Sequence, residues 1–129
     1  MRAADTNVLV RLVTRDDAAQ CARAVRFFEN NDVFIPKTAL LELEWVLRYS
    51  YTLKAANIAD AMLALLDTKR VTAEDERAAR EAIALMRQGI DFADALHLTS
   101  AAACRDLATF DKSFIKKAKQ VAPGRVAVL

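Results

Sequence analysis

The sequence predicts an α/β protein, an α/β/α sandwich with a central, mainly parallel five-stranded sheet. Five short apolar runs have the length and composition of β-strands, and they lie at 2–4, 33–36, 70–72, 107–110 and 126–129. Longer stretches with helical periodicity separate most of these runs, at 16–30, 38–51, 55–69, 74–88 and 91–105. Strands that alternate with helices form a parallel sheet whose two faces are both covered.

Residues that favour helix starts support this order of elements. Several of the helical stretches have an acid or a Thr near the first turn, where a capping residue belongs. Thr6 and Asn7 open a further helix directly after the first strand. The stretch "KSFIKKA" from Lys112 predicts a helix before the last strand.

Length and hydropathy predict one domain, residues 1–129, in the cytoplasm. The chain is 54% hydrophobic but lacks the roughly 18 uninterrupted apolar residues of a membrane span. Asp5 and Arg11 interrupt the first apolar run, so we expect no signal peptide. Cys21 and Cys104 lie in Ala-rich, helix-like stretches, and we expect reduced core residues rather than a disulfide.

The net charge of +2 is too small to identify a polyanionic partner. A local cluster of four lysines is expected to be a solvated face, and it comprises Lys112, Lys116, Lys117 and Lys119. Trp45, Tyr49 and Tyr51 are either core residues or part of an interface, since aromatic side chains are enriched in both.

Asp5 is the first acid in an unusual position, because it directly follows the first strand. Ligands of open parallel sheets bind beyond the carboxyl ends of the strands. Asp5 is therefore a candidate site residue, although it could equally cap the helix that Thr6 opens.

Two acids of the helix at 38–51 differ in their neighbours. Glu42 has no basic side chain three or four positions away, so a partner must come from elsewhere, and we interpret it as functional. Glu44 has Arg48 four positions on, which predicts an ordinary exposed ion pair.

In "GIDFADALHL" the acids Asp91 and Asp94 stand three apart, on one helical face. Asp91 is placed to cap the helix. Asp94 lies inside the helix, where Asp has poor propensity, so its presence there calls for a function or a partner. His97 could be that partner, but a lone His on an apolar helix is more often a core residue. Asp111 follows a strand as Asp5 does, and it too could be a ligand or a helix cap.

These acids predict a cation site if they converge. At an effective dielectric near 20, two like charges about 4 Å apart repel by about 4 kcal/mol, so such a cluster must bind protons or cations. Carboxylate oxygens suit Mg²⁺ or Mn²⁺. Zinc fits poorly, because the chain has one His and two distant Cys.

Four motifs resemble the PIN-domain family, specifically the VapC-type toxins of bacterial toxin–antitoxin systems. They are "DTNVLVR", "LLELEWVL", "DFADALHL" and "TFDKSF", in the family's order and at similar spacing across nearly the whole chain. The resemblance implies a PIN-like sandwich and a Mg²⁺- or Mn²⁺-dependent endoribonuclease. It also implies a homodimer held inactive by a VapB-type antitoxin that covers the pocket. The family's acidic quartet, both catalytic and metal-binding, falls on Asp5, Glu42, Asp94 and Asp111.

The resemblance also implies roles for three neighbours of these acids. Thr6 and Asn7 match residues that shape the pocket floor, and Thr109 matches a hydroxyl close to the metal. Asp91 is an alternative to Asp94 as the main ligand of its helix. The lysine cluster, with Arg11 and Arg48, is a candidate for binding the RNA backbone.

Other functions remain as alternatives or are disfavoured. Gly89 and Gly124 stand alone, so no phosphate-cradling glycine loop is present. Asn7 stands where a haloacid-dehalogenase site needs a second Asp. The main alternative is a catalytically silent PIN-like module that binds RNA or protein. Such a module would tolerate Asp5→Asn, whereas metal-activated hydrolysis would not.

Overall fold

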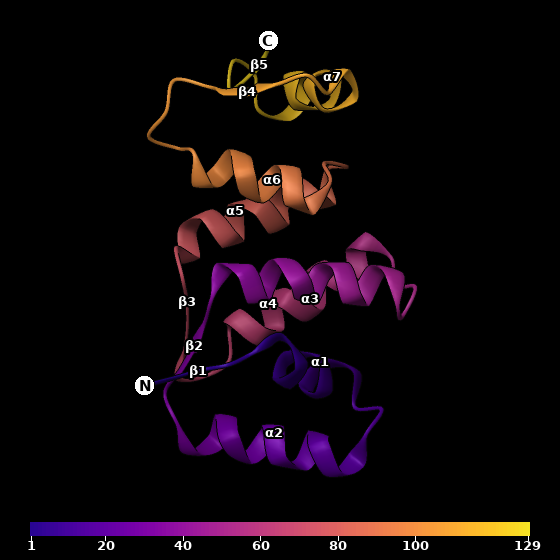
Figure 1. Cartoon of the computed structure of the whole chain (residues 1–129), viewed down its shortest axis with the longest axis vertical. Coiled ribbons are helices and arrows are strands. Elements are labelled where there is room, and N and C mark those ends of the chain that lie inside the picture. The colour runs from indigo at the N-terminus through magenta and orange to yellow at the C-terminus, as the bar shows by residue number, and fades with distance from the viewer. The chain divides into compact units, whose positions relative to one another are not determined.

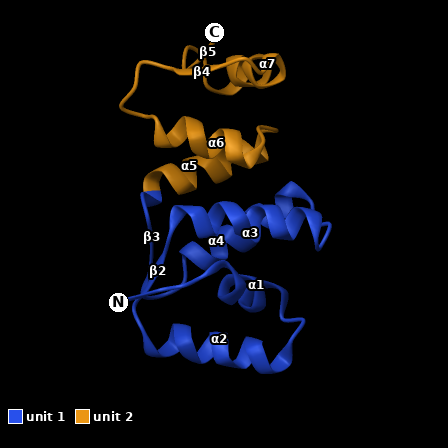
Figure 2. Cartoon of the chain, in the orientation of Figure 1, with its two compact units in different colours: residues 1–76 blue, residues 77–129 orange.

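The computed structural model describes residues 1–129, which form two compact units, Met1–Glu76 and Arg77–Leu129 (Figure 2). In chain order the elements are β1 (Arg2–Ala3), α1 (Thr6–Thr14), α2 (Ala18–Asn30), β2 (Val33–Ile35), α3 (Lys37–Tyr49), α4 (Ala55–Leu66), β3 (Val71–Ala73), α5 (Glu76–Arg87), α6 (Phe92–Ser100), β4 (Leu107–Thr109), α7 (Lys112–Val121) and β5 (Val126–Val128). No helix among them is long and apolar enough to cross a membrane.

The first unit is built on a parallel sheet with the strand order β1-β2-β3. Helices α1 and α2 connect β1 to β2, and α3 and α4 connect β2 to β3 (Figure 1). The largest fully buried side chains of this unit come from β2 and the helices, and they are Leu9, Val33, Ile35, Leu40, Leu43, Leu47, Ile58 and Met62. Each such side chain stabilises the fold by about 1.5–3 kcal/mol relative to its exposed state.

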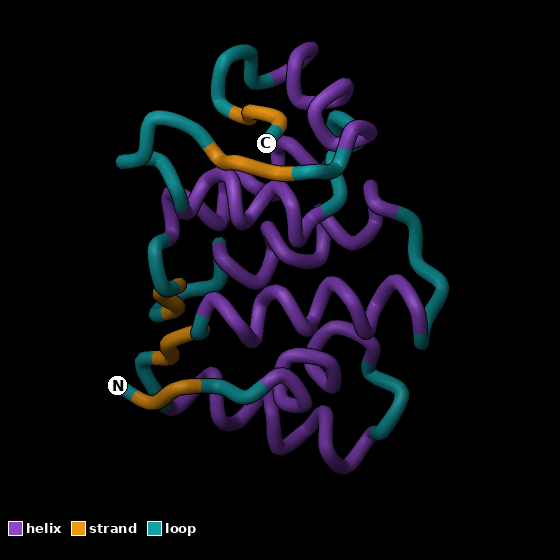
Figure 3. Tube along the Cα trace, turned by 45° about the horizontal axis from the view of Figure 1, so that its top comes forward, coloured by secondary structure: helices purple, strands orange, loops and turns teal.

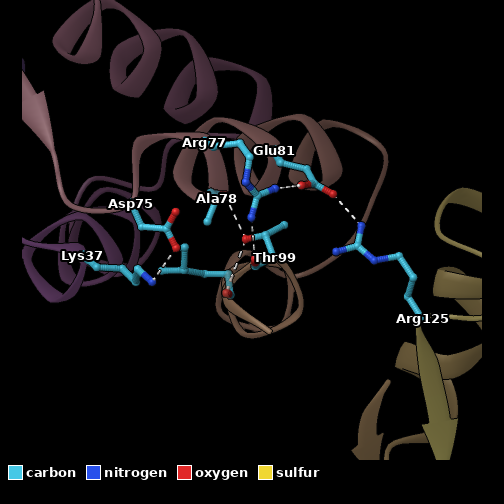
Figure 4. A network of polar contacts seen from close by, with 8 residues as sticks. Lys37, Asp75, Arg77, Ala78, Glu81, Thr99 and Arg125 are labelled. Carbon is cyan, nitrogen blue, oxygen red and sulfur yellow. Dashed lines mark hydrogen bonds and ion pairs between the residues drawn. The ribbon is translucent and has the colours of Figure 1, made fainter. Parts of the chain in front are cut away.

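The second unit consists of the helices α5, α6 and α7 and a two-stranded sheet. β4 and β5 are parallel, and α7 connects them (Figure 3). The hydroxyl of Thr99, which is fully buried in α6, donates to the carbonyl of Ala78 in α5 at 2.8 Å (Figure 4). Glu81 of α5 accepts from Arg77 at 2.7 Å and from Arg125 at 2.5 Å, which ties α5 to the segment before β5.

The prediction of a single five-stranded sheet is wrong, because the strands hydrogen-bond as one sheet of three and one of two. β1 has only two residues, and the N–H groups of Arg2 and Ala4 both donate toward β2, to the carbonyls of Asp32 and Phe34. Such a short strand leaves few backbone groups for another strand on its second edge. The alternation of strands and helices and the parallel pairing are confirmed.

The predicted helices exist, but the helix at 91–105 is too long in the prediction. α6 ends at Ser100, and its cap residue Ala101 donates its N–H to the carbonyls of His97 and Leu98. Cys104 therefore lies in an exposed turn rather than in the core, whereas Cys21 is half-buried in α2. Alanine side chains alone offer too little apolar surface to bury another helical turn.

Candidate functional site

Asp5 lies just beyond the carboxyl end of β1 and begins α1. Its backbone is extended, and its Oδ1 accepts a hydrogen bond from the Thr6 N–H at 2.8 Å. The capping role is therefore confirmed. The side chain is exposed, so capping leaves the carboxylate accessible for a second role.

Asp5 and Glu42 line the same cavity in the first unit, so the structure brings these two predicted site residues together. The cavity has a volume of about 230 Å³. Its lining residues come from the end of β1, the start of α1 and the first turns of α3, and they are Ala4, Asp5, Thr6, Pro36, Thr38, Ala39 and Glu42. The buried Thr6 belongs to this lining, as the resemblance implies, whereas Asn7 lines a neighbouring hollow.

Glu44 differs from its expected position. Its Oε2 lies 3.0 Å from Nε of Arg48, so the predicted ion pair is present, but Glu44 is only 3% exposed. The prediction of an exposed pair is therefore wrong. Glu44 is buried, as are Leu43 and Leu47, so it lies on the inner side of α3. Glu42 is exposed to solvent.

Asp91 and Asp94 lie together at the start of α6. Asp91 is the N-cap, and its Oδ1 accepts from the N–H groups of Ala93 at 3.0 Å and Asp94 at 3.4 Å. Asp94 is half-buried in the first turn. The structure therefore assigns the capping role to Asp91 and leaves the Asp94 side chain outside it.

Asp111 begins α7 as Asp5 begins α1. Its Oδ1 accepts from the Phe114 N–H at 3.0 Å, and its own N–H donates to the Thr109 hydroxyl at 3.1 Å. The carboxylate is exposed. Thr109 therefore fixes the backbone that presents the Asp111 carboxylate.

The proton equilibrium of Asp94 is perturbed by its surroundings. Burial raises the pKa of its carboxyl above the ordinary value, and the charges of Asp91 and Asp111 raise it further. His97 and Lys117 act in the opposite direction and lower it. Three carboxylates of the second unit thus interact electrostatically, and a bound cation would relieve their repulsion.

Basic side chains accompany this second group of acids. His97 is exposed, so the expectation of a core histidine is wrong, and its charge opposes that of Asp94. The four lysines of the cluster are all exposed along α7, which confirms a solvated face.

The donor chemistry fits a hard divalent cation. All the predicted ligands offer carboxylate oxygens, which Mg²⁺ and Mn²⁺ prefer. They divide between the units, with Asp5 and Glu42 in the first and Asp94 and Asp111 in the second. Within neither unit do three or more His, Cys, Asp or Glu side chains form a group that could hold a metal ion. The full four-carboxylate site therefore stays a prediction.

The aromatic residues of α3 are not in the core. Trp45 and Tyr49 are 54% and 59% exposed, and their rings lie 5.0 Å apart. Tyr51 is half-buried, and its hydroxyl donates to Asp16 at 2.6 Å. For Trp45 and Tyr49 the interface interpretation therefore remains.

Sequence reasoning missed a second hollow beside Asp5. It lies between β1, α1 and α2 and includes Arg2, Arg23 and Phe27. On α2 the lining residues recur at positions 20, 23, 24 and 27, which is the spacing of one helical face. This stripe of polar and apolar residues along α2 is the sequence signal that could have indicated the hollow.

Replacing Asp94 with Asn is expected to raise the thermal stability of the metal-free chain at pH 7. A raised pKa means that the folded state binds more protons than the unfolded state between the two pKa values, so stability falls as pH rises through that window. Asn removes this cost. Thermal melts in EDTA should show the variant above wild type at pH 7, and no difference at a pH low enough to protonate Asp94 in both the folded and the unfolded state. A pH-independent difference would contradict this explanation.

Comparison with protein families identifies a domain that covers most of the chain. The PIN domain model matches residues 3–120, which span both units. A comparison with curated proteins found no match. PIN domains are generally nucleases and commonly bind divalent metals, which agrees with the carboxylate chemistry described above. Because the match covers nearly the whole chain, the protein belongs to the PIN domain family.

Proposed function

We propose that the chain is a Mg²⁺- or Mn²⁺-dependent endoribonuclease that hydrolyses RNA phosphodiester bonds. The observation that carries the proposal is the cavity in which Asp5 and Glu42 both expose carboxylates, beyond the carboxyl end of a parallel strand. Membership of a family of nucleases supports the hydrolytic reaction.

Asp5, Glu42, Asp94 and Asp111 are the residues that would hold the metal. When bound, a divalent ion supplies charge neutralisation for the phosphate and a more acidic water at neutral pH. The caps at Asp5 and Asp111 fix these two carboxylates before any ligand arrives. Glu42 or Asp94 would orient the attacking water, and the pKa of the Asp94 carboxyl is raised by burial, which suits a group that accepts a proton.

The biological role that we propose is that of a toxin in a VapBC-type pair, acting in the cytoplasm. Its partners would be an RNA substrate, a VapB-type antitoxin and a second copy of the chain in a homodimer. The exposed pair Trp45 and Tyr49 supports an interface on α3, since exposed aromatic clusters are typical of binding surfaces.

The test is cleavage of total cellular RNA by the purified chain in Mg²⁺, in Mn²⁺ and in EDTA. We expect fragments only with metal, and recovery of activity when metal is restored after EDTA. Cleavage that continues in EDTA would contradict the metal-dependent reaction. RNA binding without cleavage in any metal would instead support a silent PIN-like binding module. Added antitoxin should suppress cleavage, and the mass of the free chain in solution tests the homodimer.

A further inference from the structure

The carboxylate of Glu81 joins two arginines of the second unit, with one oxygen on each. Its Oε2 accepts from Nη1 of Arg77 at 2.7 Å, and its Oε1 accepts from Nη1 of Arg125 at 2.5 Å (Figure 4). Arg77 and Glu81 belong to α5, whereas Arg125 stands directly before β5. We name these three residues the Glu81 bridge. It joins two parts of the unit that carry different candidate acids.

The Arg77 end of the bridge leads to α6, the helix of Asp94. Nη2 of Arg77 donates to the carbonyl oxygen of Thr99 at 3.2 Å. The buried hydroxyl of Thr99 donates in turn to the carbonyl of Ala78 in α5 at 2.8 Å. Two hydrogen bonds at Thr99 therefore tie α6 to α5. Asp94 lies earlier on the same hydrogen-bonded helix, so its position follows that of α6.

The Arg125 end of the bridge leads to Asp111. The carbonyl of Arg125 accepts from the N–H of Leu107, the first residue of β4, at 2.9 Å. β4 ends at Thr109, whose hydroxyl accepts from the N–H of Asp111 at 3.1 Å. Arg125 thus holds the strand that presents Asp111 through its backbone, and it holds Glu81 through its side chain.

The acids at the two ends, Asp94 and Asp111, interact electrostatically although they belong to different elements. Burial, the charge of Asp91 and the charge of Asp111 all raise the pKa of the Asp94 carboxyl. Like charges repel, so ionised carboxylates favour a wider separation unless other contacts oppose it. The separation of Asp94 and Asp111 therefore depends on what holds α6 and β4 in place.

The Glu81 bridge is suited to hold them at neutral pH. The hydrogen bond from Arg125 lowers the pKa of the Glu81 carboxyl, and Arg77 lowers it further, while burial acts in the opposite direction. Glu81 is therefore ionised at neutral pH. Hydrogen bonds between guanidinium and carboxylate groups are about twice as strong as neutral ones. The Glu81 side chain is 33% exposed, so water reaches it only in part.

We propose that Glu81 is a positioning residue for the metal ligands Asp94 and Asp111, whose separation it fixes through Arg77 and Arg125. This inference rests on the proposed function, in which both acids hold the metal. Glu81 is not itself a ligand in this scheme. The bridge and both acids lie in the second unit, so their geometry is that of one compact unit.

The first measurement is Mn²⁺ binding by wild type and by Glu81→Gln. Electron paramagnetic resonance counts the free Mn²⁺ during a titration, so no RNA is needed. Gln keeps the size and helix propensity of Glu, but its amide NH₂ cannot accept a hydrogen bond from an arginine. We expect Mn²⁺ affinity to fall roughly three- to tenfold, less than the roughly 10–100-fold typical when a residue that hydrogen-bonds a metal ligand is replaced.

The second measurement uses the metal-free chain. Residual dipolar couplings report the orientation of β4 relative to α6, and we expect this orientation to change in Glu81→Gln. Arg125→Gln breaks the bridge from its other end and should give the same two results. Because both substitutions act on one contact, the double variant should bind Mn²⁺ about as well as either single variant. Circular dichroism selects a temperature at which each variant is folded.

Asp106→Asn is the matched control, because it removes an arginine-paired carboxylate of the same unit with the same change in net charge. Asp106 pairs with its chain neighbour Arg105 at 3.1 Å, so this pair joins no separate elements. Both expected changes in Glu81→Gln and Arg125→Gln, with neither in Asp106→Asn, support the proposal.

Three results would overturn the proposal. They are an unchanged orientation in Glu81→Gln, an unchanged Mn²⁺ affinity despite a changed orientation, and equal effects in Asp106→Asn. A lower melting temperature alone would mean that Glu81 only stabilises the fold. Wild type that binds no Mn²⁺ would contradict the metal dependence of the proposed function. In that case the dipolar couplings still decide whether Glu81 holds α6 and β4 in place.

Discussion

Replacing Asp5 with Asn is expected to slow RNA cleavage strongly while leaving the fold intact. Asn caps helices as well as Asp does, and its side-chain oxygen can still accept the Thr6 N–H. The variant therefore loses only a negative charge in the cavity shared with Glu42. Because a metal supplies several kcal/mol of transition-state stabilisation, we expect kcat to fall by about a hundredfold or more in Mg²⁺. A fluorogenic RNA assay measures this change.

Asp17→Asn is the matched control for this experiment. Asp17 caps α2 by accepting from the Gln20 N–H at 3.0 Å, so the substitution makes the same chemical change at the same kind of position. Asp17 does not line the cavity with Glu42. Asp17→Asn should cleave RNA nearly as wild type does. Equal losses of activity in both variants, with equal melting temperatures, would rule out a specific role for Asp5.

Replacing Phe92 with Ala is expected to lower the free energy of unfolding by about 3–5 kcal/mol. Phe92 is the first residue of α6, is 1% exposed and stands between Asp91 and Asp94. Its removal leaves a cavity beneath the turn that presents these acids. Urea denaturation followed by circular dichroism measures the loss of stability.

Phe110→Ala provides the comparison, because Phe110 is in the same unit but 75% exposed. Substitutions at exposed positions usually change stability by no more than about 0.5 kcal/mol. Similar losses of stability in the two variants would contradict the assignment of Phe92 as a core anchor.

Much of the fold could be predicted from the sequence because its local signals agree with each other. Asp17 marks the start of α2, and the apolar residues of β2 mark a short buried strand. The pairing of strands could not be predicted in the same way. Whether a two-residue strand such as β1 gains a second neighbour depends on backbone hydrogen bonds that involve distant segments.

In the candidate site, too, the local features could be predicted from the sequence and the tertiary ones could not. Capping roles for Asp5, Asp91 and Asp111 follow from their places before helices, and all three are confirmed. The burial of Glu44 could not be predicted from its spacing to Arg48, because an i,i+4 spacing places two side chains on one face of a helix but does not say which face packs against the core. The packing of α1 against α2 that creates the hollow beside Asp5 is likewise tertiary.

The caps at Asp5, Asp91 and Asp111 affect which substitutions this sequence would accumulate in evolution if selection for its activity were relaxed. A lineage that needed the fold but no longer the reaction would still favour Asp, Asn, Ser or Thr at these three positions, since each serves a helix start. Glu42 and Asp94 lie inside helices and serve no cap, so mutations there would accumulate first. Loss of acids at positions 42 and 94 would therefore mark a silent descendant sooner than any change at the caps.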